Sequence, residues 1–124
     1  SDLKSFFHDT EDTQVVFSPN DYFENLNQDL RHTIQWVIPN AQKNTMEPLI
    51  ITLAPKGSSL KYLPHSGENF GYVLKGSLTL YLGAERYKIK KGESFYFEAK
   101  KEFYLYNDSK SDAELLLVSS PPNF

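Results

Sequence analysis

Residues 57–107 read GSSLKYLPHSGENFGYVLKGSLTLYLGAERYKIKKGESFYFEAKKEFYLYN, and this stretch decides the fold. It contains several short runs in which apolar and polar residues alternate, and a glycine closes each run. Leu78, Leu80 and Leu82 alternate with Ser, Thr and Tyr before Gly83, which is the period-2 pattern of a strand with one buried face. A succession of such hairpins favours a small antiparallel barrel or sandwich.

Besides these runs the sequence predicts further strands and a short helical segment at the N-terminus. Residues 1–12 place three apolar side chains on one side of a helical turn. The additional predicted strands are residues 13–17, 32–38, 49–53, 60–63 and 114–119. Residues 18–21 predict a turn, and residues 22–30 predict an irregular segment with a short strand at 27–30.

The composition indicates one folded domain, residues 13–124, preceded by a helix or linker remnant at residues 1–12. The chain has 124 residues, no cysteine and a net charge of −3, so disulfides and a thiol nucleophile are excluded. A sequence pI near 5.6 disfavours direct binding to nucleic acid. No apolar run approaches the length of a membrane span and no signal peptide is visible, so we expect no membrane association and a cytoplasmic location.

Two sets of residues recur at fixed spacing within the deciding stretch. The first set is Gly57, Leu63, His65, Asn69 and Gly76. After a gap of fifteen residues the second set is Gly92, Glu98, Lys100, Phe103 and Asn107. This spacing resembles the two-motif signature of the cupins. The resemblance implies an all-β fold, an antiparallel double-stranded β-helix (the cupin jelly roll).

The residues at the metal-binding positions of that signature depart from the family pattern. The family carries His, His, Glu and His there, whereas this chain carries Leu63, His65, Asn69 and Phe103. A transition metal needs three or four N, O or S donors, and leucine and phenylalanine supply none. We therefore predict no metal and no other cofactor, and no metal-dependent dioxygenase or isomerase chemistry.

Three further segments narrow the resemblance to one branch of the cupins. They are HSGENFGYVLKG at residues 65–76, Met46-Glu47-Pro48 before a strand, and SPPNF at residues 120–124. Together they resemble the C-terminal sensor domains of bacterial transcriptional regulators that join an XRE-type helix-turn-helix to a cupin. That resemblance implies a homodimer, a small-molecule effector in the barrel, and DNA contact only through an N-terminal domain that this chain lacks. Because related regulators include polyamine sensors, it also implies an amine or polyamine effector.

The alternation of a cupin barrel assigns a set of candidate ligand-binding residues. Leu63, His65, Asn69, Phe95, Phe97 and Phe103 are predicted to face inward, with Trp36 and Tyr62 closing the mouth. Glu47 or Glu68 near the rim would pair with an amine. The predicted ligand-binding residues are Trp36, Glu47, Tyr62, His65, Glu68, Asn69, Phe97 and Phe103.

Each of these residues also has a purely structural interpretation. His65 fits a histidine satisfied by a backbone carbonyl, the phenylalanines fit a filled barrel, Trp36 fits a core residue and Glu68 fits a solvated charge. The predicted function is an effector-sensing domain of a transcriptional regulator and not an enzyme. The alternatives are a metal-free isomerase or lyase with His65 as general base, and a cupin that serves dimerisation alone.

Overall fold

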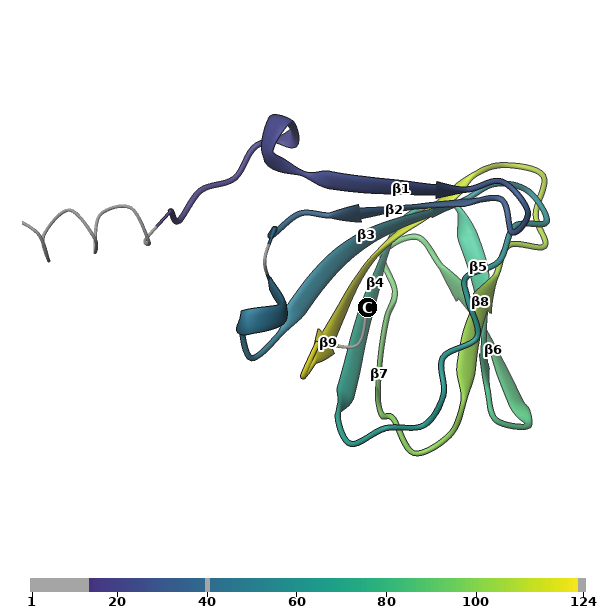
Figure 1. Cartoon of the computed structure of the whole chain (residues 1–124). Coiled ribbons are helices and arrows are strands. Elements are labelled where there is room, and N and C mark those ends of the chain that lie inside the picture. The colour runs from purple at the N-terminus through teal and green to yellow at the C-terminus, as the bar shows by residue number, and fades with distance from the viewer. Residues whose placement is uncertain (1–13, 40, 123–124) are drawn as a thin grey trace, which may run out of the picture.

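The computed structural model describes residues 14–39 and 41–122, and these are almost entirely β-structure (Figure 1). Their nine strands are β1 (Phe23–Asn27), β2 (His32–Trp36), β3 (Glu47–Leu53), β4 (Glu68–Lys75), β5 (Ser77–Leu82), β6 (Glu85–Lys90), β7 (Ser94–Glu98), β8 (Phe103–Tyr106) and β9 (Ala113–Ser120). Two 3-10 turns, Pro19–Asp21 and Ala41–Lys43, supply the helical structure in these ranges. Within them, no helix is long and apolar enough to cross a membrane. The predicted all-β class is confirmed.

The strands form two antiparallel sheets that enclose the core (Figure 1). The larger sheet has the order β1-β2-β3-β9-β4-β7, and the smaller has the order β6-β5-β8. Residues 58–62 run antiparallel to β8 through bridges from Ser58 to Tyr106 and from Tyr62 to Phe103. Gly76, with φ +70°, makes the sharp turn that carries the chain from β4 in one sheet to β5 in the other. This is the predicted double-stranded β-helix.

The core follows the period of two in the sequence. In β3 every second residue is buried, and the same holds in β9. The register places Leu49 opposite Leu117 and Ile51 opposite Leu115, so buried residues of neighbouring strands fall in rows. These rows face the smaller sheet, where Leu78 and Leu105 are fully buried. Burial of these side chains is the main source of stability for the two-sheet arrangement.

The N-terminal strand prediction is wrong for the residues that the structure describes. Residues 14–17 are irregular, and Val15 and Val16 are 82% and 80% exposed. β-branched residues favour a strand, but an isolated segment forms one only where a neighbouring edge accepts its hydrogen bonds. Residue 13 and the helical segment predicted at 1–12 lie outside the described residues. The turn predicted at 18–21 is confirmed by the 3-10 turn Pro19–Asp21.

The first strand lies instead in the region predicted to be irregular. β1 has little apolar alternation and its side chains are mostly exposed, because it is an edge strand held by its pairing with β2. The short strand predicted at 27–30 is a turn, in which the Leu30 amide donates to Asn27 Oδ1 at 2.9 Å. The strand predicted at 60–63 is reduced to the single bridge at Tyr62.

Asn107, the last residue of the second motif, is buried and ties the end of β3 to the loop between β8 and β9. Its Nδ2 donates to the carbonyls of Leu53 at 2.9 Å and Ser111 at 2.7 Å. Its Oδ1 accepts from the amide and the hydroxyl of Ser109 at 2.9 and 2.7 Å. The amide thus satisfies backbone groups at the ends of β3 and β8 and before β9.

Replacing Asn107 is expected to destabilise the fold while leaving the apolar core unchanged. Asn107→Ala should lower the free energy of unfolding by about 2–4 kcal/mol, because buried backbone carbonyls lose their donor. Urea unfolding followed by circular dichroism measures this change. The control is Asn25→Ala on the exposed face of β1, which should change stability by less than about 0.5 kcal/mol. Equal effects of the two substitutions would contradict the assigned role.

Candidate functional site

Several strands of the larger sheet begin or end at the same end of the sheet, and polar residues gather there. The register pairs Glu47 of β3 with Ser119 of β9, and Ser119 in turn with Asn69 of β4. Asn69 then pairs with Phe97 of β7. We call Glu47, Ser119 and Asn69 the polar row. All three are fully buried on the core side of the sheet, which is unusual for charged and amide side chains.

One hydrogen bond joins two members of the polar row. Ser119 Oγ donates to Asn69 Oδ1 at 2.6 Å, which fixes the orientation of the amide. Asn69 Nδ2 therefore points its two hydrogens elsewhere, and within the described residues it has no hydrogen-bond partner. Because a buried donor without an acceptor costs free energy, Asn69 Nδ2 is a natural contact point for a bound molecule or water.

Tyr62 lies near the polar row, in the segment that is bridged to Phe103 of β8. Its ring packs on Phe103 with ring centroids 5.0 Å apart, and Phe103 meets Phe97 edge to face at 4.9 Å. Burial raises the pKa of Tyr62 above its ordinary value, and the nearby negative charge of Glu47 raises it further. The site therefore holds a carboxylate and a protonated phenol close together behind an aromatic wall.

Trp36 supplies a second buried donor at this end of the sheet. It pairs with Leu49, which lies on the same face of β3 as Glu47. Its ring meets Phe23 edge to face at 6.2 Å. Trp36 Nε1 is buried and has no acceptor within the described part of the chain. Trp36 and Asn69 thus place two N–H donors on the side of the larger sheet that also carries the Glu47 carboxylate.

His65 and Glu68 lie in a separate, shallow pocket outside the polar row. This pocket of about 360 Å³ is lined by residues 65–68 together with Glu98 and Lys100. The His65 amide donates to the Ala99 carbonyl at 2.9 Å, and its buried Nε2 has no partner in the described chain. Glu68 is exposed, as expected for a rim residue.

Two placements predicted from the sequence are wrong. Leu63 was expected to face inward and is 68% exposed, whereas its neighbour Tyr62 is buried. The backbone bridge between Tyr62 and Phe103 sets which side chains of this segment turn inward. It turns Tyr62 into the core and Leu63 outward. Glu47 was expected near the rim and has no exposed surface, because the pairing with β9 draws it into the sheet.

Ser119 is the site residue that sequence reasoning missed. Its signal was present in the pattern of residues 114–119, because a period of two puts Ser119 on the same face as Leu115 and Leu117. The other inward predictions hold for Asn69, Phe97 and Phe103, which are buried, and for Phe95, which is half-buried. His65, also predicted to face inward, is half-buried and lines the separate shallow pocket.

The four positions that hold a metal in the family signature do not form a metal site in this chain. Leu63 points to solvent, Phe103 fills the core, and Asn69 offers an amide whose oxygen is already engaged by Ser119. Among residues 14–39 and 41–122 no three His, Cys, Asp or Glu side chains are grouped to hold an ion. The residues present therefore do not fit a transition metal, which needs several N, O or S donors.

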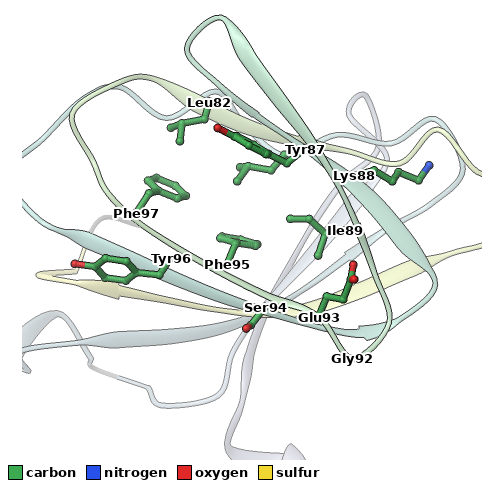
Figure 2. Close-up of a pocket in the computed structure, with 11 residues that line it drawn as sticks. Leu82, Tyr87, Lys88, Ile89, Gly92, Glu93, Ser94, Phe95, Tyr96 and Phe97 are labelled. Atoms are coloured by element: carbon green, nitrogen blue, oxygen red, sulfur yellow. The ribbon is translucent and has the colours of Figure 1, made fainter.

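A larger opening lies at the side of the molecule, between the free edges of β6 and β7. Figure 2 shows its side chains, which come from both sheets and surround a space of about 710 Å³. We call this opening the side groove. Its lining residues are Leu80, Leu82, Tyr87, Lys88, Ile89, Gly92, Glu93, Ser94, Phe95, Tyr96 and Phe97.

The fold and the polar row together define a small β-roll domain with buried polar groups at one end of its larger sheet. The profile of the Cupin_2 family, described as a cupin domain, matches residues 49–119, more than half of the chain. The chain therefore belongs to the cupin domain family. A relative in sequence is the uncharacterized protein MJ1618 of Methanocaldococcus jannaschii, 28% identical over 85 residues, or 68% of each chain.

Solved structures of similar fold come from both enzymes and regulators. A predicted oxalate decarboxylase of Thermotoga maritima has a TM-score of 0.74 at 16% identity, covering 86% of this chain and 98% of that one. The Cupin_2 domain of an XRE family transcriptional regulator from Enterobacter cloacae has a TM-score of 0.66 at 18% identity, covering 74% and 98%. An oxalate oxidase has a TM-score of 0.68 at 15% identity over 81% of this chain, which spans 56% of that chain's length. At such identities these likenesses establish the fold alone.

The raised pKa of Tyr62 predicts a specific sensitivity to alkaline pH. The unfolded chain loses its tyrosine protons near pH 10, while folded Tyr62 keeps its proton. The unfolded state then binds fewer protons, so stability should fall as the pH rises above about 10. Tyr62→Phe should reduce this fall between about pH 9 and 11, measured by urea unfolding. Tyr72→Phe, on the exposed face of β4, serves as control, and equal slopes in the two variants would contradict the assignment.

Proposed function

We propose that this cupin domain binds a small polar molecule at the polar row and does so without a metal ion. The observation that carries the proposal is the pair of buried donors, Trp36 Nε1 and Asn69 Nδ2, that have no acceptor within the described residues and share a sheet face with Glu47. A buried donor that lacks an acceptor costs roughly 1–3 kcal/mol. A ligand that accepts from both would recover that free energy on binding.

The charge at the site favours an amine as ligand. Glu47 is the acidic side chain of the polar row, and it lies fully buried at the edge of an apolar core. A cationic group placed beside this carboxylate would be strongly attracted at such low dielectric. The N–H donors of Trp36 and Asn69 additionally require an oxygen or nitrogen acceptor on the ligand. Amino alcohols and amino acids meet both requirements, whereas a fully protonated polyamine carries donors only and meets the first.

The biological role we propose is effector sensing within a bacterial, cytoplasmic transcriptional regulator. The motifs at residues 65–76 and 120–124 support it, as does the fold shared with the cupin domain of an XRE family regulator. In this role the domain forms a homodimer and contacts DNA only through a helix-turn-helix domain placed before residue 1. Occupancy of the polar row would then alter DNA binding with a coupling free energy on the order of 1–3 kcal/mol.

A second candidate function is acid–base catalysis at the same site. Glu47 and Tyr62 supply two titratable groups close enough for the charge of one to raise the pKa of the other. Sequence reasoning had found only His65 for this role, and His65 lies in the separate shallow pocket. Because oxalate oxidase and a predicted oxalate decarboxylase share the fold, an isomerase or lyase that needs no metal is compatible with it.

Binding of amines is expected to depend on the buried carboxylate. Thermal shift followed by calorimetry with ethanolamine, putrescine and amino acids should reveal at least one amine that raises the melting temperature. Ethylene glycol, which keeps a hydroxyl acceptor but lacks the charge, should bind at least about tenfold more weakly than ethanolamine. Glu47→Gln should weaken amine binding by a similar factor.

The matched control is Glu114→Gln, the same chemical change on the half-exposed face of β9. It should leave amine affinity within about twofold of that of the unchanged protein. If no amine binds, or if both substitutions weaken binding equally, the proposed site is wrong. Conversion of a bound amine, with turnover lost in both Glu47→Gln and Tyr62→Phe, would favour the catalytic candidate over sensing.

The regulatory role predicts a domain and a response outside this chain. The gene is expected to encode a helix-turn-helix domain upstream of residue 1. The full-length protein should then bind DNA next to its own gene, with an affinity that the amine changes about 5- to 150-fold. Gel-shift titration with and without the amine measures this. An upstream sequence with no DNA-binding domain would refute the regulatory role while leaving ligand binding at the polar row intact.

A further inference from the structure

The side groove exists because β6 and β7 follow one another in the chain yet belong to different sheets. β6 is the free edge of the smaller sheet and β7 is the free edge of the larger one. The turn between them is held on β4, since the Gly92 amide donates to the Val73 carbonyl at 2.9 Å and the Val73 amide donates to the Glu93 carbonyl at 3.0 Å. The two edges therefore diverge from this anchored turn without pairing with each other.

On the inner face of the roll, some side chains near the free edge of β6 are exposed to solvent. Tyr87 and Ile89 lie on the same face of β6, where Tyr87 pairs with Leu80 and Ile89 with Leu78. Ile89 is only 5% exposed, whereas Tyr87 is 46% exposed. Leu82 is half-buried in the same way. The inner, apolar face of the roll is thus open to solvent along the side groove.

The opposite wall is an aromatic pair fixed by packing. The rings of Phe95 and Phe97 stack at 5.9 Å with an angle of 18° between their planes. Phe95 lies flat on β4 at Gly71, where any Cβ would overlap its ring. Figure 2 shows Phe95 and Phe97 across the space from Leu82 and Ile89. A flat molecule could enter between an aromatic wall and an aliphatic wall, an arrangement common in small-molecule sites.

Three polar side chains that line the side groove, those of Tyr87, Lys88 and Glu93, are already engaged within the chain. Lys88 Nζ lies 2.8 Å from Asp108 Oδ1, and this hydrogen bond holds the pKa of Asp108 below its usual value. Glu93 Oε1 accepts from the Lys90 amide at 2.8 Å. The Tyr87 hydroxyl donates to the Glu85 carboxylate at 2.7 Å. A charged ligand would have to compete with these contacts, so the groove favours an uncharged one.

A β-strand from another chain is not expected to pair with the edge of β6 and fill the side groove. The exposed edge strand β6 carries Arg86, Lys88 and Lys90 at alternate positions. Positive charges on an edge strand discourage pairing with another chain. A space of about 710 Å³ is also within the usual size range of a small-molecule pocket.

We propose that the side groove is a second binding site, for a flat, uncharged aromatic molecule. This site goes beyond the proposed function, because its walls come from β5, β6 and β7 and include no member of the polar row. The ligand ring would stack on Phe95 and Phe97 and be covered by Tyr87 and Leu82. Occupancy would close the open edge of the roll and raise the stability of the fold.

The probe for this site is N-phenyl-1-naphthylamine, an uncharged aromatic molecule whose fluorescence rises in apolar surroundings. Titration should give saturable binding of one probe per chain. Tyr87→Ala should weaken the affinity at least about fivefold, because it removes one wall. The matched control is Tyr72→Ala on the outer face of β4, with a similar exposure of 39%, and it should change affinity less than about twofold. The anionic analogue 1-anilinonaphthalene-8-sulfonate should bind more weakly than the neutral probe.

Three results would overturn the proposal. The first is non-saturable fluorescence, and the second is an equal loss in Tyr87→Ala and Tyr72→Ala when circular dichroism confirms that both are folded. The third is probe binding that disappears as the protein concentration rises, which would make the side groove an interface between copies. Glu47→Gln should leave probe binding unchanged, so failure at the polar row and failure at the side groove are distinguishable.

Discussion

The pairing of β9 with both β3 and β4 is the constraint on which the rest of the molecule depends. β9 is a central strand of the larger sheet, and its register fixes every buried row across three strands. A slip of one residue would turn Leu115 and Leu117 outward and bring the alternate residues into the core. The same register sets Ser119 between Glu47 and Asn69. Hydrophobic burial along most of β9 thus secures the position of the polar row at its end.

This arrangement explains how the fold tolerates the loss of the family's metal-binding residues. Asn69 occupies the position of a carboxylate, and a neutral amide there is stabilised by the hydroxyl of Ser119 at 2.6 Å. Phe103 replaces a polar ligand and instead packs on Tyr62 and Phe97. A buried acidic side chain is present instead at Glu47 of β3, which β9 separates from β4. The inside of the roll keeps a polar end, in which a hydrogen bond between Ser119 and Asn69 stands where the family signature has a metal ligand.

The two candidate sites differ because paired strands enclose the end of the larger sheet, whereas the edges of β6 and β7 at the side are unpaired. At the end of the larger sheet, the pairing of β3, β9 and β4 places polar side chains on the inner face, and Tyr62 lies near enough for Glu47 to raise its pKa. At the side, β6 and β7 leave both sheet edges unpaired, so apolar residues such as Tyr87 and Phe95 face an opening. In our proposals the first site would select ligands by charge and hydrogen bonds, and the second by shape and apolar surface.

The sequence by itself determined the strands within residues 77–106 and the last strand, because period-2 alternation and closing glycines are local signals. The succession of hairpins predicted there is wrong except for β5 and β6, because the other consecutive strands lie in different sheets or pair elsewhere. The double-stranded β-helix followed from the resemblance of the two motifs to those of the cupins. The sequence also placed Asn69, Phe97 and Phe103 inside. It could not find β1, whose exposed side chains carry no apolar pattern and whose backbone is held by β2. Only the tertiary structure decided that Tyr62 and not Leu63 turns inward, and that Glu47 is buried beside Ser119. Those outcomes depend on register between strands far apart in the chain, and a local pattern carries no information about which distant residue will lie opposite.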